Sequence, residues 1–269
     1  MAKKKERLDV LLVEKGFFES REQAKRSIMA GEIFIDNQRV DKAGEKVDVE
    51  GVIDYKGSKM PYVSRGGYKL EKAIKNFGID LNDTICMDIG ASTGGFTDCM
   101  LQNGASKVYA IDVGYGQFAW KLRVDERVVC LERTNVRYAT NEQVPDECDF
   151  ASIDVSFISL KTIMPAVTGL LKEDGEVMAL IKPQFEAGRE KVGKKGVVRD
   201  PQTHIEVIEK IVNYALDHNL RILNIDFSPI KGPEGNREYL IHLKKSAEKQ
   251  IDFDFNIIEE VVSASHTTL

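Results

Sequence analysis

Apolar residues in the first part of the chain follow helical spacing and then alternate with polar ones. Leu8 and Leu12 predict a helix that Gly16 can end. Ser20 and Gln23 have the spacing of a capping box, which predicts a second helix to about residue 30. Short alternating segments follow, namely Ile33 to Ile35, Val40, and Val47 to Val49. This part of the chain is therefore expected to form a small α+β domain.

From residue 84 onward, apolar runs of strand length alternate with segments of helical pattern. Strands are predicted at residues 85–89, 108–111, 128–131, 150–153, 177–181, 222–227 and 239–243. Helices are predicted at residues 95–103, 116–123, 159–171 and 201–217. Alternation of this kind predicts a parallel, doubly wound sheet. A short turn rich in Pro and Gly, residues 228–235, separates the last two strands, so these two must pair antiparallel.

A linker is expected at residues 56–67, K-G-S-K-M-P-Y-V-S-R-G-G, where Gly, Ser and Pro gather. The domain boundary is therefore placed near residue 60, giving an N-terminal domain of residues 1–60 and a second domain of residues 61–269. Charge is uneven along the chain: residues 1–78 carry 17 Lys and Arg against 13 Asp and Glu, and the rest carries 21 against 30. A basic N-terminal part suits contact with a polyanion.

The composition is that of an ordinary soluble protein, with 42% hydrophobic and 30% charged residues in a chain of 269. No apolar run approaches the roughly 18 residues that span a bilayer. No apolar segment follows the basic start Met1–Arg7, so no secretory signal is expected. The cysteines are scattered and form no metal-ligating cluster: Cys86, Cys99, Cys130 and Cys148. We therefore expect free thiols, no bound metal and a cytoplasmic protein without a membrane partner.

The N-terminal pattern resembles the RNA-binding module of the ribosomal protein S-four superfamily. The residues that carry the resemblance are Arg7-Leu-Asp9, Gly16, Ser20-Arg21, Ala24, Ile28, Gly31, Ile33, Ile35-Asp36, Val40 and Gly44. It implies that four basic residues contact RNA phosphates, namely Arg7, Arg21, Lys25 and Arg26. Arg65 of the linker is a further candidate for RNA binding. The alternative is that these side chains are solvated charges on helix surfaces.

A glycine-rich segment follows the first predicted strand of the second domain and has the sequence D-I-G-A-S-T-G-G-F-T, residues 88–97. Glycines let the backbone approach a ligand at the carboxyl edge of a sheet. The spacing G-x-x-x-G-G differs from that of dinucleotide binders and favours S-adenosylmethionine. Asp112 ends the next strand, where its carboxylate suits ribose hydroxyls or, alternatively, caps a helix. The candidate cofactor-binding residues are Asp88, Gly90, Ala91, Ser92, Gly94, Gly95, Phe96, Asp112, Val113, Thr134, Asn135, Asp154 and Phe157.

Taken together, these features resemble the hemolysin A (TlyA) family of ribosomal RNA 2′-O-methyltransferases, whose catalytic domain is FtsJ-like. The resemblance implies a Rossmann-like class I methyltransferase fold, with a mostly parallel sheet and an antiparallel last strand, next to the small N-terminal α+β domain. It implies S-adenosylmethionine as cofactor, ribosomal RNA or ribosomal subunits as partner, and cytidine as target. It also implies a catalytic tetrad: Lys69, Asp154, Lys182 and Glu238.

The strand pattern supports this tetrad independently. Asp154 and Lys182 follow predicted parallel strands, and Glu238 precedes the antiparallel one, so these three should meet at one edge of the sheet. A ribose 2′-hydroxyl must lose its proton to attack a methyl group. Our hypothesis makes Lys182 the base and Asp154 the group that orients it, with Lys69 and Glu238 positioning the ribose. A lysine base needs a pKa below its ordinary value of about 10.4, through burial or a nearby like charge.

Several alternatives stay open at this point. If the resemblance is set aside, the four tetrad residues can equally well be interpreted as salt bridges at strand ends. The net-basic segment 183–199 could close over the target, with Phe185 or Phe157 stacking on its base, or be a solvated loop. A second function is a non-catalytic RNA-binding factor for ribosome assembly, and a third is membrane lysis, for which no amphipathic basic helix is visible. The sequence leaves the oligomeric state open, with a monomer as the default.

Overall fold

The structure is a computed structural model that describes residues 4–18, 20–57 and 60–269. Residues 1–3 of the basic start and residues 58–59 of the expected linker lie outside the described residues. The chain divides into two compact units, Met1–Pro61 and Tyr62–Leu269. Each unit has its own hydrophobic core.

The first unit packs two helices against short strands. Its elements are β1 (Lys5–Arg7), α1 (Leu8–Glu14), α2 (Arg21–Met29), β2 (Ile33–Ile35), β3 (Gln38–Arg39), β4 (Lys46–Asp48) and β5 (Ile53–Tyr55). β1 pairs with β4, and β2 pairs with β3 and β5. Ser20 caps α2 as predicted, because its hydroxyl accepts a hydrogen bond from the Gln23 amide at 3.3 Å. The sequence pattern did not predict β1 and β5, which are only three residues long.

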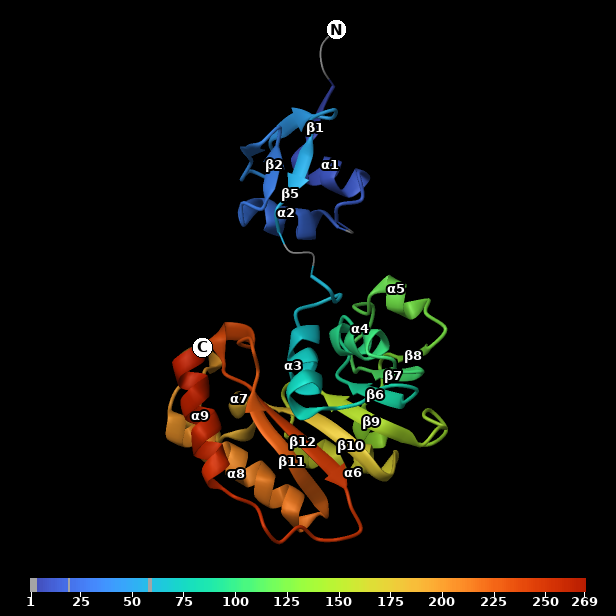
Figure 1. Ribbon diagram of the computed structural model, residues 1–269, viewed down its shortest axis with the longest axis vertical. Coiled ribbons are helices and arrows are strands. Elements are labelled where there is room, and N and C mark those ends of the chain that lie inside the picture. Colours follow the sequence, from blue (N-terminus) through green and yellow to red (C-terminus); the bar gives the residue numbers. More distant parts are fainter. Residues whose placement is uncertain (1–3, 19, 58–59) are drawn as a thin grey trace. The chain divides into compact units, whose positions relative to one another are not determined.

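The second unit is built on a sheet with helices on both faces. Its strands are β6 (Ile85–Ile89), β7 (Lys107–Ile111), β8 (Val128–Leu131), β9 (Cys148–Ile153), β10 (Leu171–Ile181), β11 (Leu220–Phe227) and β12 (Tyr239–Lys245). They lie in the order β11-β12-β10-β9-β6-β7-β8 (Figure 1). β12 is antiparallel to β10 and β11, whereas the other pairs are parallel. The prediction of a mostly parallel sheet with a reversed last strand is confirmed.

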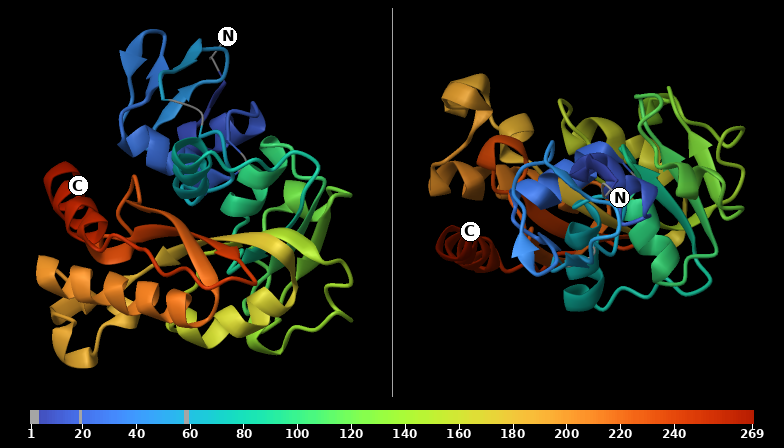
Figure 2. Two further views of the ribbon diagram at one scale, coloured as in Figure 1. Left: turned by 60° about the horizontal axis from the view of Figure 1, so that its bottom comes forward. Right: turned by 90° about the horizontal axis from the view of Figure 1, so that it is seen from above.

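Successive residues along these strands enter cores on opposite faces of the sheet. The helices are α3 (Gly67–Phe77), α4 (Gly95–Gln102), α5 (Trp120–Arg123), α6 (Leu160–Gly169), α7 (Pro183–Glu186), α8 (Pro201–Asp217) and α9 (Asn256–Thr268). α6, α8 and α9 bury apolar residues against one face, and α3 and α4 cover the other (Figure 2). α8 begins as predicted, with Asp200 accepting a hydrogen bond from the Thr203 amide at 3.0 Å and Pro201 in the first turn.

Two expectations about individual elements are wrong, and one element was not predicted. The helix predicted at 116–123 is reduced to α5, because Gly116 has a left-handed φ of +77° and its amide donates to the Glu132 carboxylate at 2.7 Å. The strand predicted at 177–181 starts at Leu171, where the helix expected to reach that residue has already ended. The C-terminal helix α9 follows a polar stretch and was not predicted at all.

Candidate active site

The glycine-rich segment after β6 is shaped by close contacts that leave no room for side chains. Gly90 and Gly94 have left-handed φ values of +85° and +92°. A Cβ atom on Gly90 would lie 2.5 Å from the backbone oxygen of Asp154. A Cβ atom on Gly95 would lie 2.2 Å from the Ser64 hydroxyl. The segment therefore packs directly against both the linker side and the Asp154 side of the site.

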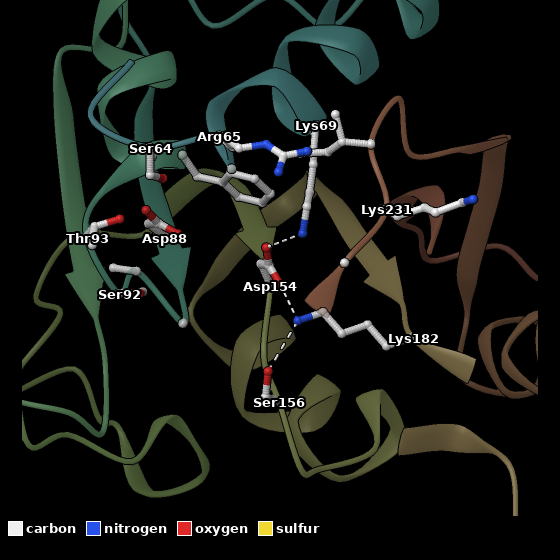
Figure 3. Close-up of a pocket in the computed structure, with 17 residues that line it drawn as sticks. Ser64, Arg65, Lys69, Asp88, Ser92, Thr93, Asp154, Ser156, Lys182 and Lys231 are labelled. Carbon is white, nitrogen blue, oxygen red and sulfur yellow. Dashed lines mark hydrogen bonds and ion pairs between the residues drawn. The ribbon is translucent and has the colours of Figure 1, made fainter. Parts of the chain in front are cut away.

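A cavity of about 450 Å³ opens at this edge of the sheet (Figure 3). Its lining comes from the glycine-rich segment, the start of α3, and the loops after β9, β10 and β11. The lining residues are Ser64, Arg65, Gly66, Lys69, Asp88, Gly90, Ala91, Ser92, Thr93, Gly95, Phe96, Asp154, Ser156, Lys182, Ile230, Lys231 and Gly232.

Asp154 lies between two lysines on one side of this cavity. Its Oδ2 atom is 3.0 Å from Nζ of Lys69, and its Oδ1 atom is 2.5 Å from Nζ of Lys182 (Figure 3). Nζ of Lys69 also lies 2.7 Å from the Glu238 carboxylate, and Nζ of Lys182 lies 3.3 Å from the Ser156 hydroxyl. The structure thus brings the four tetrad residues into one charged cluster, at the ends of α3, β9, β10 and β12.

Burial and charge compete in this cluster. Burial alone would raise the pKa of Asp154, but the positive charges of Lys69 and Lys182 outweigh it and lower that pKa. Burial alone would lower the pKa of Lys69, but Asp154 and Glu238 outweigh it and raise that pKa. The two carboxylates therefore favour the ammonium form of Lys69.

Asp88 is a buried carboxylate that faces the cavity with one unused oxygen. Its Oδ2 atom accepts hydrogen bonds from the amide and the hydroxyl of Thr97, at 2.8 and 2.6 Å. Its Oδ1 atom is buried and has no hydrogen-bond partner. Burial raises the pKa of Asp88 to about 7, against the opposing effect of the Thr97 hydrogen bonds. An unused acceptor of this kind calls for a donor from a ligand.

Asp112 follows β7, and its carboxylate accepts hydrogen bonds from the backbone of two turns. Its Oδ2 atom accepts from the Ser92 amide at 2.7 Å, and its Oδ1 atom accepts from the Gly114 amide at 2.6 Å. Each carboxylate oxygen keeps a second lone pair, so Asp112 can still accept from a hydroxyl. Both sequence interpretations of this residue, ligand acceptor and turn residue, are compatible with these contacts.

Other predicted cofactor-binding residues do not line the cavity in its present form: Gly94, Asp112, Val113, Thr134, Asn135 and Phe157. The side-chain oxygen of Asn135 accepts from the Arg137 amide at 3.1 Å and caps a short 3₁₀-helix. Val113 is 71% exposed beside Asp112. Phe157 is 90% exposed, and its ring centroid lies 4.9 Å from that of Phe185. An aromatic pair with one ring this exposed can offer a stacking surface to a base.

Sequence reasoning missed several lining residues. Ser64 and Thr93 lie beside the glycines, whereas Ile230, Lys231 and Gly232 come from the turn between β11 and β12. A Cβ atom on Gly232 would lie 2.1 Å from the Glu238 carboxylate, so this turn folds back onto the tetrad. The Gly and Pro residues of the turn were visible as a sequence signal, but they predicted only a chain reversal. Arg65, a candidate for RNA binding, lines the cavity.

In the first unit, two of the predicted RNA-binding residues share one buried carboxylate. Nε of Arg7 lies 3.0 Å from Oδ1 of Asp9, and Nη2 of Arg21 lies 2.7 Å from Oδ2. The hydrogen bond from Arg7 is the largest effect on the pKa of Asp9, which falls to about 2. The Arg7 and Arg21 side chains remain 45% and 53% exposed, so they keep donors for phosphates. Lys25 pairs with Glu22, and Arg26 is exposed.

The described part of the chain contains no group of three or more His, Cys, Asp or Glu side chains placed to hold a metal ion. Within the same residues, no helix is both long and apolar enough to cross a membrane. All four cysteines are free, and Cys86, Cys99 and Cys148 are buried.

Comparison with known proteins places both units in known families. The family described as FtsJ-like methyltransferase matches residues 62–245, and the S4 domain matches residues 6–53. The 16S/23S rRNA (cytidine-2′-O)-methyltransferase TlyA of Mycobacterium tuberculosis is 41% identical over 91% of this chain and 92% of its own. Hemolysin A of Brachyspira hyodysenteriae is 43% identical over 88% of this chain and 98% of its own.

A solved structure of a hemolysin-type protein from Streptococcus thermophilus is 50% identical and superposes with a TM-score of 0.78, covering 99% of this chain and 98% of that chain. Because the FtsJ-like match spans most of the chain and these relatives are similar over nearly their full length, the chain belongs to the FtsJ-like methyltransferase family, among the TlyA and hemolysin A proteins that begin with an S4 domain.

Proposed function

We propose that this protein methylates the 2′-hydroxyl of a cytidine ribose in ribosomal RNA, with S-adenosylmethionine as methyl donor and Lys182 as general base. The observation that carries the proposal is the cluster of Lys69, Asp154, Lys182 and Glu238 on the wall of the cavity beside the glycine-rich segment. A relative at 41% identity is named for this reaction on cytidine.

The cavity suits S-adenosylmethionine in three respects. The unused Oδ1 atom of Asp88 can accept a hydrogen bond from the ammonium group of its methionine part. Gly90 and Gly95 keep the cavity wall free of side chains. Asp112 does not line the cavity itself, but it accepts from the amide of the lining residue Ser92 and can still accept from ribose hydroxyls. We assign the donor site to these residues, together with Ala91, Ser92 and Phe96 of the same segment.

The sulfonium group of S-adenosylmethionine supplies a methyl carbon that is already electrophilic. The protein must then hold the 2′-oxygen in line and accept its proton as the new C–O bond forms and the C–S bond breaks. Lys182 takes that proton on Nζ. Asp154 orients Lys182, and the ammonium group of Lys69 attracts the developing negative charge on the ribose oxygen. Glu238 fixes Lys69 in place.

RNA is bound by both units in this proposal. Arg7, Arg21, Lys25 and Arg26 of the S4 domain contact phosphates, and Arg65 and Lys231 do so at the rim of the cavity. The exposed Phe157, with the partly buried Phe185 beside it, stacks on the target base once that base leaves its helix.

The test is transfer of radiolabelled methyl groups from S-adenosylmethionine to ribosomes, separate subunits and free ribosomal RNA that lack the modification. Wild type is compared with Lys182→Ala and with Lys249→Ala, a matched change at an exposed lysine. We expect a label that survives alkaline hydrolysis as a 2′-O-methylated dinucleotide. Loss of the base should lower the rate by about 10²- to 10⁴-fold, and Lys249→Ala should have no effect.

Two outcomes would contradict the proposal. Lys182→Ala retaining most of the activity would remove Lys182 as base but leave the reaction standing. Tight RNA binding by wild type with no label on any substrate would instead favour a non-catalytic factor in ribosome assembly.

A further inference from the structure

Glu186 is a buried carboxylate in a segment that the mechanism above uses only for Lys182 and Phe185. It ends the short helix α7, which starts directly after Lys182, and its side chain is 5% exposed. A buried carboxylate is costly unless several donors satisfy it. The contacts of Glu186 therefore show what holds it in this position.

Both oxygens of Glu186 bind the loop that follows β9. Its Oε2 atom accepts from the Ser159 hydroxyl at 2.6 Å, and its Oε1 atom accepts from the Leu160 amide at 2.7 Å. Ser159 is the N-cap of α6, so the carboxylate also sits at the positive end of that helix. The Glu186 backbone oxygen accepts from Nζ of Lys210 at 2.8 Å, which ties α7 to α8.

These contacts join the two loops that carry the reactive groups. One loop runs from Asp154 through Ser156 and Phe157 to Ser159, and Phe157 in it has a left-handed φ of +65°. The other runs from Lys182 to Glu186. Across the same gap, Lys182 contacts Asp154 and Ser156, and the rings of Phe157 and Phe185 are 4.9 Å apart. Glu186 closes the far end of this two-loop assembly.

We propose that Glu186 is a positioning residue that locks the Lys182 loop onto the Asp154 loop and so sets the alignment of Lys182 with the ribose 2′-hydroxyl. The contacts within the protein support the lock itself, and its effect on catalysis rests on the proposed function. Misplacement of a reacting group by about 1 Å can cost about 10²-fold in rate. Removing the lock should thus act on the chemical step, while the donor site on the glycine-rich segment stays intact.

The test compares Glu186→Ala and Glu186→Gln with Glu190→Ala, an exposed glutamate in the following turn. Alanine removes both acceptors, whereas glutamine keeps one and has nearly the same shape. The rate is measured in a single turnover at saturating RNA and S-adenosylmethionine. This rate is divided by the concentration of sites that bind S-adenosylhomocysteine, so that unfolded protein does not lower the rate per site.

We expect the rate per site to fall by about 10- to 100-fold for Glu186→Ala, less for Glu186→Gln, and not at all for Glu190→Ala. Affinities for S-adenosylhomocysteine and RNA should stay within about twofold, because neither oxygen of Glu186 faces the donor site. An unchanged rate per site in Glu186→Ala would overturn the inference. If that variant does not fold, the same result in Glu186→Gln would overturn it.

Amide hydrogen exchange separates this inference from the proposed function. Residues 154–160 and 182–187 should exchange faster in both Glu186 variants than in wild type and Glu190→Ala, even if no RNA is ever methylated. Unchanged protection of both segments would refute the lock directly. Absence of methyl transfer by wild type, with the expected change in exchange, would refute only the proposed reaction.

Discussion

Nζ of Lys69 lies 2.7 Å from a carboxylate oxygen of Glu238, and the Glu238 side chain is completely buried. Lys69 comes from the first turn of α3 and Glu238 from the residue before β12, so folding of the whole second unit is needed to bring them together. Lys69 is also nearly buried, with 9% of its side chain exposed. Glu238 therefore depends on Lys69 for compensation of its charge, whereas the charge of Lys69 is compensated by Glu238 and Asp154 together.

Replacing one partner of this pair should destabilise the protein strongly. Lys69→Met leaves the Glu238 carboxylate buried without its cation, and we expect unfolding to become easier by about 3–5 kcal/mol. Urea unfolding followed by circular dichroism measures the change. The double variant Lys69→Met with Glu238→Gln should recover a part of the loss. Lys75→Met changes an exposed lysine of the same helix and should be neutral; an equal loss in Lys75→Met would show that the pair is not the cause.

Gly90→Ala should disable the donor site. The added Cβ atom would lie 2.5 Å from the Asp154 backbone oxygen, and the left-handed φ of +85° disfavours any side chain. Either the glycine-rich segment or the Asp154 loop must move. We expect the affinity for S-adenosylhomocysteine, measured by calorimetry, to fall at least about tenfold, because a loss of about 1.4 kcal/mol of binding free energy lowers an affinity tenfold.

The matched change is Gly169→Ala in α6, where φ is not positive and no atom lies within 4 Å of the added Cβ. This variant should bind S-adenosylhomocysteine like wild type and be slightly more stable. Normal binding by Gly90→Ala would contradict the close packing described for this segment.

Affinity for S-adenosylhomocysteine should fall in acid because of Asp88. Burial raises the pKa of Asp88 to about 7, and an ammonium ligand favours the ionised carboxylate. Below pH 7 binding must first remove the proton, so the affinity should drop by roughly tenfold per pH unit. Calorimetry between pH 6 and 8 checks this, and Asp88→Asn should bind weakly at every pH. A flat profile in wild type would place the ligand ammonium elsewhere.

Folding stability should fall between about pH 6.5 and 4 because of His204. This side chain is fully buried, its Nε2 atom lies 3.1 Å from the Val198 oxygen, and its Nδ1 atom lies 2.7 Å from the Tyr239 hydroxyl. Burial, opposed by the Val198 hydrogen bond and aided by His266 and Arg237, lowers the pKa of His204 to about 4. The folded state thus holds neutral histidine.

In that window the unfolded chain binds the proton and the folded chain does not, so stability rises with pH and is lost as pH falls. The expected loss is about 3 kcal/mol from pH 7 to pH 4. Urea unfolding across this range measures it, and His204→Gln should flatten this part of the profile. An equally steep profile in that variant would assign the effect to other groups.

A change at Arg26 tests the proposed RNA contact of the S4 domain and leaves the ion pairs of Asp9 with Arg7 and Arg21 in place. Arg26→Gln removes an exposed charge from α2, and we expect RNA affinity to fall and the slope of log affinity against log salt to shrink by about one unit. Filter binding over a salt series measures both. Lys249→Gln in the second unit is the matched change, and an identical effect of the two variants would argue for bulk charge rather than a contact.

The sequence predicted the elements whose signals are local. Asp200 and Pro201 predicted the start of α8 correctly. The apolar runs at β6 to β9 predicted strands correctly, because a continuous apolar run is the main sequence signal of a buried strand. The order of strand ends also placed Asp154, Lys182 and Glu238 at one edge of the sheet. Lys69 was assigned by family resemblance, since nothing near it in the sequence points toward Glu238.

The missed features depend on contacts between distant segments. α9 becomes a helix against α8 and β11, with Ile258 and Val262 buried, although a polar stretch precedes it in the sequence. The turn that carries Lys231 reaches the cavity only because Gly232 lets it fold onto Glu238. The partners of Glu186 come from a loop that precedes it by more than twenty residues. No periodicity along the chain encodes such contacts.

The bare Cα of Gly90 against the Asp154 backbone has a consequence for inhibition. The glycine-rich segment and the lysine pair line one cavity, and Gly90 packs directly against the backbone of Asp154, whose side chain contacts both lysines. A compound whose bulky substituent displaces Gly90 would therefore also displace Asp154. Its effect would then extend beyond competition with S-adenosylmethionine to a reduced rate with every RNA substrate.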